Sequence, residues 1–265
     1  MFFFLVPMVT MLSLSLQTCN QVTLACHLTW SWSNFPDQIR QYHSQFANSL
    51  VYGSLATAID LAVSYPLAYW IAFYGGRRKN FFLLMLLLPF FVSFVIRTLT
   101  WSFILADQGL VLGTLKRIHL LPGSFHVLAS GTAVVAGIAY NYLPFTALPL
   151  YVALERIDRR VVEAAGDLYA SRIAVFTRVI LPLTIPGIFA SFLLTFVPAI
   201  GDYVNAAILG GTNNYMIGNV IQDSFLVYSN YSAASALSAI LMAVALIGIF
   251  AYARVLGGRT IEEYI

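Results

Sequence analysis

Two carboxylates of this sequence lie where a charge is costly. Asp60 sits inside a long apolar run, and Asp202, followed by Tyr203, ends another. A carboxylate at membrane depth is tolerated when it faces a protein interior or a water-filled cavity, where it marks a path for a solute. Structural roles are the alternative: Asp60 can pair with a neighbouring subunit or with a hydroxyl such as that of Tyr65, while Asp202 and Tyr203 can be a helix cap and an interfacial anchor.

The side chains that usually perform catalysis or bind metals show no suitable pattern. No metal-ligand spacing relates the four His residues, which are His27, His43, His119 and His126. The sequence contains no Gly-x-Ser-x-Gly elbow for a nucleophile and no Gly-Lys-Ser/Thr phosphate loop. We therefore expect a protein that is not an enzyme, carries no metal site and does not itself hydrolyse ATP.

The composition is that of a polytopic membrane protein. Of 265 residues, 60% are hydrophobic and 9% charged, whereas soluble domains carry about 25% charged residues. The apolar runs are continuous and lack the alternation of barrel strands, which predicts an all-α protein of membrane-spanning helices. Most of the basic residues fall between these runs rather than on one amphipathic face, so nothing indicates binding to nucleic acid.

Six apolar runs predict six transmembrane helices. They are Phe2–Leu16, Phe46–Tyr74, Phe81–Leu105, His126–Leu154, Leu183–Ile200 and Ala233–Leu256. The first reaches only about 22 Å as a helix, less than the bilayer core of about 30 Å. We interpret it as a short or clipped span rather than a signal peptide, because the basic n-region is missing. Pro89 is expected to break the third span, and Pro144 and Pro149 to kink the fourth.

The segments between the runs are polar. Residues 17–45 predict a Trp-rich loop near the membrane interface, residues 107–125 a short interfacial helix and a turn, and residues 201–231 a polar loop. Cys19 and Cys26 share the first of these segments. A disulfide is one possibility if that loop faces an oxidising compartment, and two unrelated cysteines are the other.

The distribution of Lys and Arg predicts the orientation. The loops after the second and fourth spans, the last turn of the sixth span and the C-terminal tail hold ten of these residues, whereas the loops after the first, third and fifth spans hold three. Positively charged loops remain on the cytoplasmic side. We therefore expect a protein of the inner membrane with both termini in the cytoplasm.

The longest charged interval lies between the fourth and fifth spans. Nine of the 25 charged residues fall between Glu155 and Arg178. Apolar residues recur there at helical spacing, namely Ile157, Val161, Ala164 or Ala165, and Leu168. Arg159 and Glu163 are four positions apart and can pair, for about 0.3 kcal/mol. This pattern predicts an amphipathic helix that either rests on lipid headgroups or docks a soluble protein.

Particular residues of this interval resemble a known signature. Glu163-Ala164-Ala165, with Leu181-Pro182 beginning 18 positions after Glu163, resembles the EAA motif of importer-type ABC permeases. Two positions depart from the motif, because Tyr169 stands in the usual Gly position and Val179 in that of Ile. The substitution of Tyr for Gly bears on the turn between the two short helices of the motif.

The resemblance extends over most of the chain from the second span onward. Several further segments are similar to the spermidine/putrescine transporter permeases, in particular to the first of their two permease subunits. These segments are Leu88-Pro89-Phe90 with Arg97-Thr98, Leu143-Pro144-Phe145 with Leu148-Pro149-Leu150-Tyr151, residues 197–204, Leu209-Gly210-Gly211 and residues 217–221.

This resemblance implies a type I ABC importer permease of the MetI-like fold. Residues 1–45 would form the short first span and outer loop, residues 46–256 a permease core of five spans with a cytoplasmic coupling helix within 155–178, and residues 257–265 a cytoplasmic tail. The implied partners are a second permease subunit, two ATPase subunits that carry ATP and Mg²⁺, and an external solute-binding protein. The residues implied to couple to the ATPase are Glu163, Ala164, Ala165, Gly166, Asp167, Leu168, Tyr169, Ala170 and Ser171.

The implied cargo is a polyamine, which translocates when ATP drives alternating access. Its ammonium groups would be attracted by carboxylates and aromatic faces, so Asp60, Asp202 and Tyr203 are the candidates for the path. Arg97 would repel such a cargo and is expected to have an interfacial or salt-bridged structural role. Another small solute, such as a different organic cation or a phosphonate, is the first alternative, and an ATPase-independent channel or membrane scaffold is the second.

Overall fold

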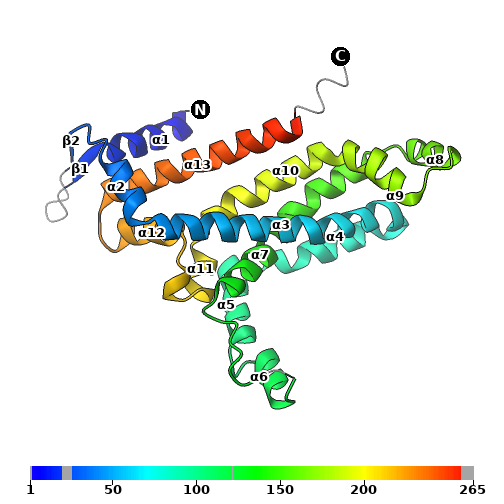
Figure 1. Ribbon diagram of the computed structural model, residues 1–265, viewed down its shortest axis with the longest axis horizontal. Helices are drawn as coiled ribbons and strands as arrows, with labels where there is room; N and C mark the ends of the chain where they lie inside the picture. The colour runs from blue at the N-terminus through cyan, green and yellow to red at the C-terminus, as the bar shows by residue number, and fades with distance from the viewer. Residues whose placement is uncertain (1, 20–25, 121, 258–265) are drawn as a thin grey trace. The chain divides into compact units, whose positions relative to one another are not determined.

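The computed structural model describes residues 2–19, 26–120 and 122–257, and these are almost entirely helical (Figure 1). The α-helices are α1 (Phe2–Ser15), α2 (Asn34–Gln41), α3 (His43–Tyr74), α4 (Lys79–Leu87), α5 (Phe94–Leu105), α6 (Leu110–Arg117), α7 (Gly131–Glu155), α8 (Arg159–Asp167), α9 (Arg172–Val175), α10 (Leu181–Ile200), α11 (Val204–Leu209), α12 (Ile217–Leu226) and α13 (Tyr231–Gly257). Short 3₁₀ or π segments are η1 (Gly76–Arg78), η2 (Leu88–Phe91), η3 (Phe176–Ile180) and η4 (Thr212–Asn214). The tail residues 258–265 lie outside the described residues.

Four helices in the described part of the chain are long and apolar enough to cross a membrane. They are His43–Tyr74, Gly131–Glu155, Arg172–Ile200 and Tyr231–Ala251. A fifth span results when the bent pair Gly76–Phe91 and Phe94–Leu105 counts as one. The first predicted span forms a shorter apolar helix, Leu5–Ser15. All six apolar runs are thus helical, and up to five have the length of a span.

The helices do not begin where the apolar runs begin. The fourth run was expected to start a helix at His126, but α7 starts at Gly131. The fifth was expected from Leu183, but its helix extends back to Arg172. Hydropathy marks the part of a helix that lies in hydrocarbon, whereas the backbone hydrogen bonds continue into polar sequence. The charged interval is therefore partly continuous with the fifth span.

The predicted break at Pro89 is a sharp bend. Leu88–Phe91 form a 3₁₀ turn, and Val92 is extended with ψ 141°. The helices on either side differ in direction by 87°. Proline has no N–H to donate to the preceding turn, which weakens the helix at this point. By contrast, α7 continues as one helix through Pro144 and Pro149.

Backbone contacts divide the chain into two compact units. The first contains residues 1–54, 98–138 and 199–248. Within it, the predicted polar loop at 201–231 was wrong, because α11 and α12 form there and bury Ile217 and Val220 against Leu237 of α13. Apolar residues at Ile217, Val220 and Ile221 have helical spacing, and this signal is easily hidden among polar neighbours.

The segment before α3 also has regular structure. Strands β1 (Gln17–Cys19) and β2 (Cys26–Leu28) pair antiparallel, with Cys19 and Cys26 as partners in the register. The expected Trp-rich loop is therefore a short hairpin followed by α2. The side chains of both cysteines lie outside the described residues, so their bridging stays a prediction.

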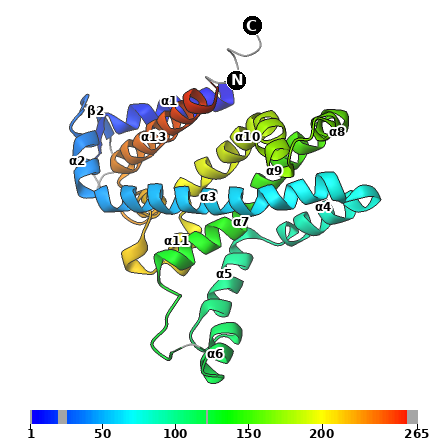
Figure 2. The same ribbon diagram turned by 45° about the vertical axis from the view of Figure 1, so that its right-hand side comes forward.

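The second unit contains residues 55–97, 139–198 and the chain from 249 onward. In Figures 1 and 2, α4 runs beside the C-terminal half of α3. A core gathers from α3, α7 and the segment around α9, and its buried residues are Ala68, Ala72, Leu150, Leu154, Val175 and Ile180. Because lipid is as apolar as these side chains, close packing rather than water exclusion holds such helices together.

Buried hydroxyls join α7 to α10 in the same unit. The hydroxyls of Thr146 and Thr195 are 2.6 Å apart, and Ser191 Oγ donates to the carbonyl of Thr146 at 2.8 Å. Gly187 of α10 lies so close to Ala153 of α7 that a Cβ at position 187 would overlap the alanine side chain. Interhelical hydrogen bonds of this kind contribute about 0.6 kcal/mol each in membranes.

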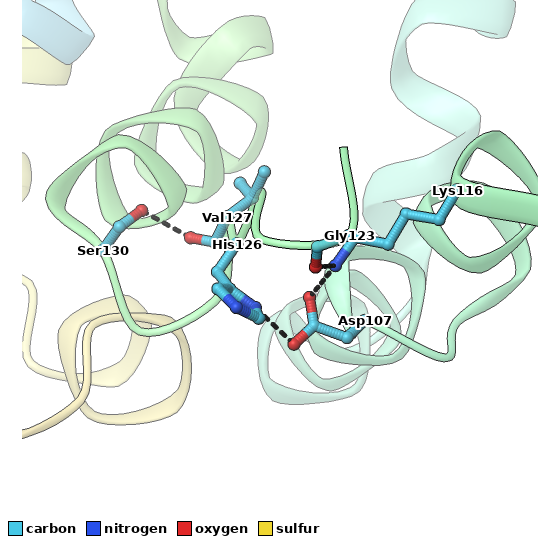
Figure 3. Close-up of polar contacts among 6 residues, drawn as sticks. All are labelled: Asp107, Lys116, Gly123, His126, Val127 and Ser130. Atoms are coloured by element: carbon cyan, nitrogen blue, oxygen red, sulfur yellow. Dashed lines mark hydrogen bonds and ion pairs between the residues drawn. The ribbon is translucent and has the colours of Figure 1, made fainter. Parts of the chain in front are cut away.

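The segment between α5 and α7 is held by one carboxylate (Figure 3). Asp107 accepts from Lys116 Nζ at Oδ1, 2.8 Å away, and its Oδ2 lies 2.6 Å from His126 Nδ1. Lys116 also donates to the carbonyl of Gly123 at 3.2 Å. These contacts tie α6 to both ends of the segment. Hydrogen bonds from Lys116 and His126 hold the pKa of Asp107 below its usual range.

The structure predicts that this segment loosens in acid. The fold favours the ionised form of Asp107. The contribution of Asp107 to the stability of this segment is therefore complete above the ordinary carboxyl pKa of about 4, and it is lost as pH falls through the lowered pKa. Backbone hydrogens of residues 106–130 should therefore exchange faster in Asp107→Asn than in the unsubstituted protein at pH 7, and this difference should shrink as pH falls below about 4. Asp37→Asn in α2 is the control, and equal exchange of Asp107→Asn and the native chain at pH 7 would contradict this role.

Candidate coupling site and intramembrane polar groups

A helix forms within the charged interval and is capped at its start. Helix α8 spans Arg159–Asp167, and Asp158 precedes it in an extended conformation. The Asp158 carboxylate accepts from the backbone N–H of Arg160 at 3.0 Å. An Asp at this position satisfies a donor that the helix leaves unpaired and contributes about 1 kcal/mol. Glu163 is exposed on this helix.

The turn after α8 has the geometry that a glycine would give. Tyr169 has φ 57°, in the left-handed region. Its N–H donates to the carbonyl of Gly166 at 3.0 Å, and that of Ala170 donates to Ala165 at 3.3 Å. Together these bonds form a Schellman motif, which usually places Gly at the left-handed position. Tyr for Gly therefore leaves the turn in place and adds backbone strain.

The predicted apolar stripe of α8 is divided between two faces. Ile157 and Ala165 pack, with Val162, against the core formed by α3 and α7. Val161 and Leu168, which were expected on the same stripe, are exposed. The prediction of one continuous docking stripe was wrong because the inward face of α8 is used by the protein's own core.

The predicted pair between Arg159 and Glu163 is replaced by another contact. Arg159 Nη2 donates to the carbonyls of Ala72 and Phe73 at 3.3 and 3.4 Å. These carbonyls belong to the last turn of α3, where a cation also meets the negative end of the helix dipole. Arg159 therefore fixes α8 to the end of α3. Lys79 of α4 and Glu155 of α7 form an ion pair in the same unit.

A π-helical turn lies between α9 and α10. It covers Phe176–Ile180, and the Leu181-Pro182 pair of the signature opens α10 directly after it. Such π turns are rare and often occur at functional positions. The Ser171 side chain caps α9 by accepting from the N–H of Ala174 at 3.2 Å. The signature thus corresponds to a capped helix, a tight turn and a π segment.

Asp60 is buried in α3 with one unsatisfied oxygen. The side chain is 1% exposed, and its Oδ2 has no hydrogen-bond partner among the described residues. The suggested pairing with Tyr65 was wrong, because the Tyr65 hydroxyl bonds to that of Thr184 at 2.9 Å. A buried acceptor of this kind is costly unless a group from outside reaches it.

Asp202 is also buried, but its oxygens are satisfied locally. Oδ1 accepts from the backbone N–H of Asn205 at 2.9 Å, and Oδ2 from the Asn205 side-chain amide at 2.7 Å. Thr98 of α5 donates to Asn205 Oδ1 at 3.1 Å. Asp202 therefore caps α11, which is the structural role that the sequence offered as the alternative to a solute path. Its role in a solute path stays a prediction.

Tyr203 lies on a cavity that the sequence did not indicate. The cavity has a volume of about 560 Å³ and is bounded by α1, α12, α13 and the turn before α11. Its polar lining includes Gln222, Ser235 and Ser238 beside Tyr203. The sequence carries no signal for this cavity, because the cavity forms only when the first and last helices of the chain pack beside one another.

Arg97 was expected to have an interfacial or salt-bridged role, and within the described chain it forms no ion pair. Its Cζ lies 4.2 Å from the centre of the Phe90 ring and 6.0 Å from that of Phe94. Nε and Nη1 are buried, and neither has a hydrogen-bond partner among the described residues. A desolvated cation over an aromatic ring gains about 2 kcal/mol, yet two donors still lack acceptors.

The described residues contain no cluster suited to a metal. Across residues 2–19, 26–120 and 122–257, no three His, Cys, Asp or Glu side chains gather closely enough to bind one. Helices α8 and α9 form an exposed corner, and isolated polar groups lie within the spans.

Comparison with known proteins places the chain in a family. Residues 64–261 match the family of binding-protein-dependent transport system inner membrane components. The chain therefore belongs to this family of multi-pass membrane proteins. Membership favours a transport subunit over an enzyme and over the ATPase-independent channel or scaffold that the sequence left open.

Individual relatives and solved structures narrow the kind of transport subunit further. The spermidine/putrescine transport system permease protein PotB of Haemophilus influenzae is 35% identical over 96% of this chain and 88% of that protein. PotB of Escherichia coli is 34% identical over 70% and 67%. A bacterial ABC transporter involved in the import of alginate matches with TM-score 0.70 at 19% identity, covering 86% of this chain and 84% of that one. The MetNI methionine ABC transporter in inward-facing form matches with TM-score 0.62 at 17% identity, covering 87% and 99%. The fold is that of an ABC importer permease.

Proposed function

We propose that this permease subunit carries polyamines such as spermidine and putrescine inward across the membrane by ATP-driven alternating access. The observation that supports this cargo is the 35% identity with a spermidine/putrescine permease over 96% of the chain. The fold by itself does not select a cargo, because the alginate importer shares it and alginate is an acidic polysaccharide. ATP and Mg²⁺ are bound by two separate ATPase subunits, and an external solute-binding protein delivers the cargo.

Uptake in cells tests the cargo directly. A strain without other polyamine importers should accumulate labelled spermidine or putrescine when it expresses this chain with the second permease, ATPase and binding protein of its own system. Uptake of another organic cation or of a phosphonate, with neither polyamine, would contradict the proposal. The same cells without the ATPase measure the passive background.

Asp60 is the path residue that the geometry supports best, because its Oδ2 is buried and unsatisfied. Asp60→Asn removes the charge that attracts an ammonium group and keeps the shape of the side chain. The apparent transport constant for spermidine should rise about tenfold, which corresponds to 1.4 kcal/mol. Ser64→Ala, one turn further along α3, removes a buried polar group without a charge and is the control. An unchanged constant in Asp60→Asn would exclude Asp60 from the path.

Arg97 and the helix that carries it, α5, support contact with a second permease subunit. The apolar side chains of Ile96 and Phe103 on α5 are exposed, and two buried donors of Arg97 lack acceptors in the described chain. An arginine at membrane depth needs an anionic or carbonyl partner. We propose that α5 packs on the second permease and that a carboxylate of that subunit accepts from Arg97.

Replacing Arg97 should weaken the pairing of the two permeases. Arg97→Met keeps much of the side-chain length and removes the donors, so the second subunit should co-purify about tenfold less, equivalent to 1.4 kcal/mol. Arg117→Met on α6, where the side chain is exposed, is the matched control. If Arg97→Met retains as much second permease as this control, the carboxylate partner is disproved.

The excess of Lys and Arg in alternate loops supports cytoplasmic termini, with α8 on the cytoplasmic side. Gly166 in α8 and Gly123 before α7 both have open space where a Cβ would lie. In a chain whose two native cysteines are replaced by alanine, Gly166→Cys should react with an impermeant maleimide only after the membrane is permeabilised. Gly123→Cys should react in intact cells. The opposite pattern would invert the topology.

A further inference from the structure

The cavity beside Tyr203 separates the first helix of the chain from two others in the same unit. Residues 7–14 of α1 form one wall, α12 forms a second, and residues 234–241 of α13 form a third. In Figures 1 and 2, α1 runs beside the first half of α13. On this side of α1, the cavity therefore takes the place of direct helix packing.

Hydrogen bonds hold α1 at its C-terminal end. The side-chain amide of Asn34 donates to the carbonyl of Ser15 at 2.9 Å and to the hydroxyl of Ser232, the second residue of α13, at 3.1 Å. These bonds join α1 and α13 beside the β1–β2 hairpin. The part of α1 that lines the cavity precedes this junction, so its attachment to α12 and α13 depends on what fills the cavity.

The lining suits an apolar molecule. None of the described residues on it is charged. Two of its hydroxyls bond to their own helices, since Thr10 Oγ1 donates to the carbonyl of Pro7 and Ser238 Oγ to that of Ala234, both at 2.8 Å. Hydroxyls used in this way have no proton to offer a ligand. A polyamine would find no carboxylate here, whereas an apolar chain would lose no hydrogen bond on entering.

The dimensions fit a lipid chain better than a helix. The lining extends over residues 7–14 of α1 and 234–241 of α13, which is about 11 Å along each helix axis. Dividing the volume of about 560 Å³ by this length gives a mean cross-section of about 50 Å². A helix with its side chains is about 10 Å across and needs about 80 Å². The length also stays within one leaflet, whose hydrocarbon is about 15 Å deep.

An unfilled space of this size would destabilise the packing of α1. Native interiors hold few voids larger than a water molecule, and a wall without neighbouring atoms loses its dispersion contacts. Water does not fill such a space readily, because apolar cavities stay dry. The outer faces of α1 and α13 expose Leu5, Val9 and Leu246, which suits contact with lipid. A lipid chain can therefore enter without crossing an aqueous phase.

We infer that this cavity binds an acyl chain of a membrane phospholipid, which connects α1 to α12 and α13. The chain supplies the contacts that side chains do not make between these helices. It also touches Tyr203, the residue next to Asp202. The site is independent of the cargo, since nothing in its lining depends on which solute the permease carries.

Filling the cavity tests the lipid site. Ser238→Leu enlarges a side chain that lines the cavity, and Ala243→Leu enlarges an exposed one on the same helix. The permease, purified with its associated subunits and stripped of lipid, receives palmitoyl-oleoyl phosphatidylethanolamine, and native mass spectrometry counts the lipids that bind. Ser238→Leu should bind one lipid fewer, with at least tenfold lower occupancy of the tightest site. Ala243→Leu should bind lipid as the native protein does.

The melting temperature gives a second measurement. A ligand that binds only the folded state raises the melting temperature, so added lipid should raise it equally in the native protein and in Ala243→Leu. The rise should be smaller in Ser238→Leu. Before lipid is added, Ser238→Leu should melt no lower than the native protein, because the new side chain fills part of the cavity. Met11→Trp narrows the cavity from α1 and gives the same test if Ser238→Leu fails to fold.

Two results would overturn the inference. One is equal lipid occupancy in the native protein, Ser238→Leu and Met11→Trp, which would place the bound lipid elsewhere. The other is a native protein that binds no lipid tightly while Ser238→Leu releases the second permease. A part of that subunit would then cover the cavity in place of lipid.

Discussion

A bilayer offers no water to a polar group, and this constraint shapes every helix contact of the protein. Thr146 and Thr195 satisfy one another between α7 and α10, and Asp202 is satisfied by Asn205. The described chain supplies no hydrogen-bond partner to Asp60 Oδ2 or to two nitrogens of Arg97. The free-energy cost of burying these atoms remains until another group bonds to them. Asp60 and Arg97 carry opposite charges, so a cationic group would suit Asp60 and an anionic group would suit Arg97.

The corner formed by α8 and α9 is packed onto the spans rather than attached to them only by a loop. Ile157, Val162 and Ala165 share a core with α3 and α7, and Arg159 holds the carbonyls at the end of α3. A displacement of α8 therefore moves the ends of these helices with it, since packed cores shift as units rather than deform continuously. This gives a physical route by which a displacement of the corner reaches the interior of the membrane.

The helical segments, including the helix at the Glu163 signature, could be predicted because their signals are local. Apolar runs locate helices in hydrocarbon, Pro89 breaks one of them, and the Glu163 signature coincides with α8. Other features depend on contacts far apart in the sequence. Arg159 hydrogen-bonds to the end of α3 rather than pairing with Glu163, and sequence spacing cannot reveal this contact. The left-handed Tyr169 could be suspected only from its position, because the propensity of Tyr gives no reason to expect it.

The π turn at Phe176–Ile180 makes the connections of the corner mechanically unequal. Its hydrogen-bond ladder is already interrupted, and helices bend more readily at such a place. A push along α10 is still transmitted, because the backbone is continuous, but a tilt is absorbed there. The corner is thus connected rigidly to α3 and α7 and flexibly to α10. A rocking motion of the corner would turn α3 and α7 together and let α10 lag behind them.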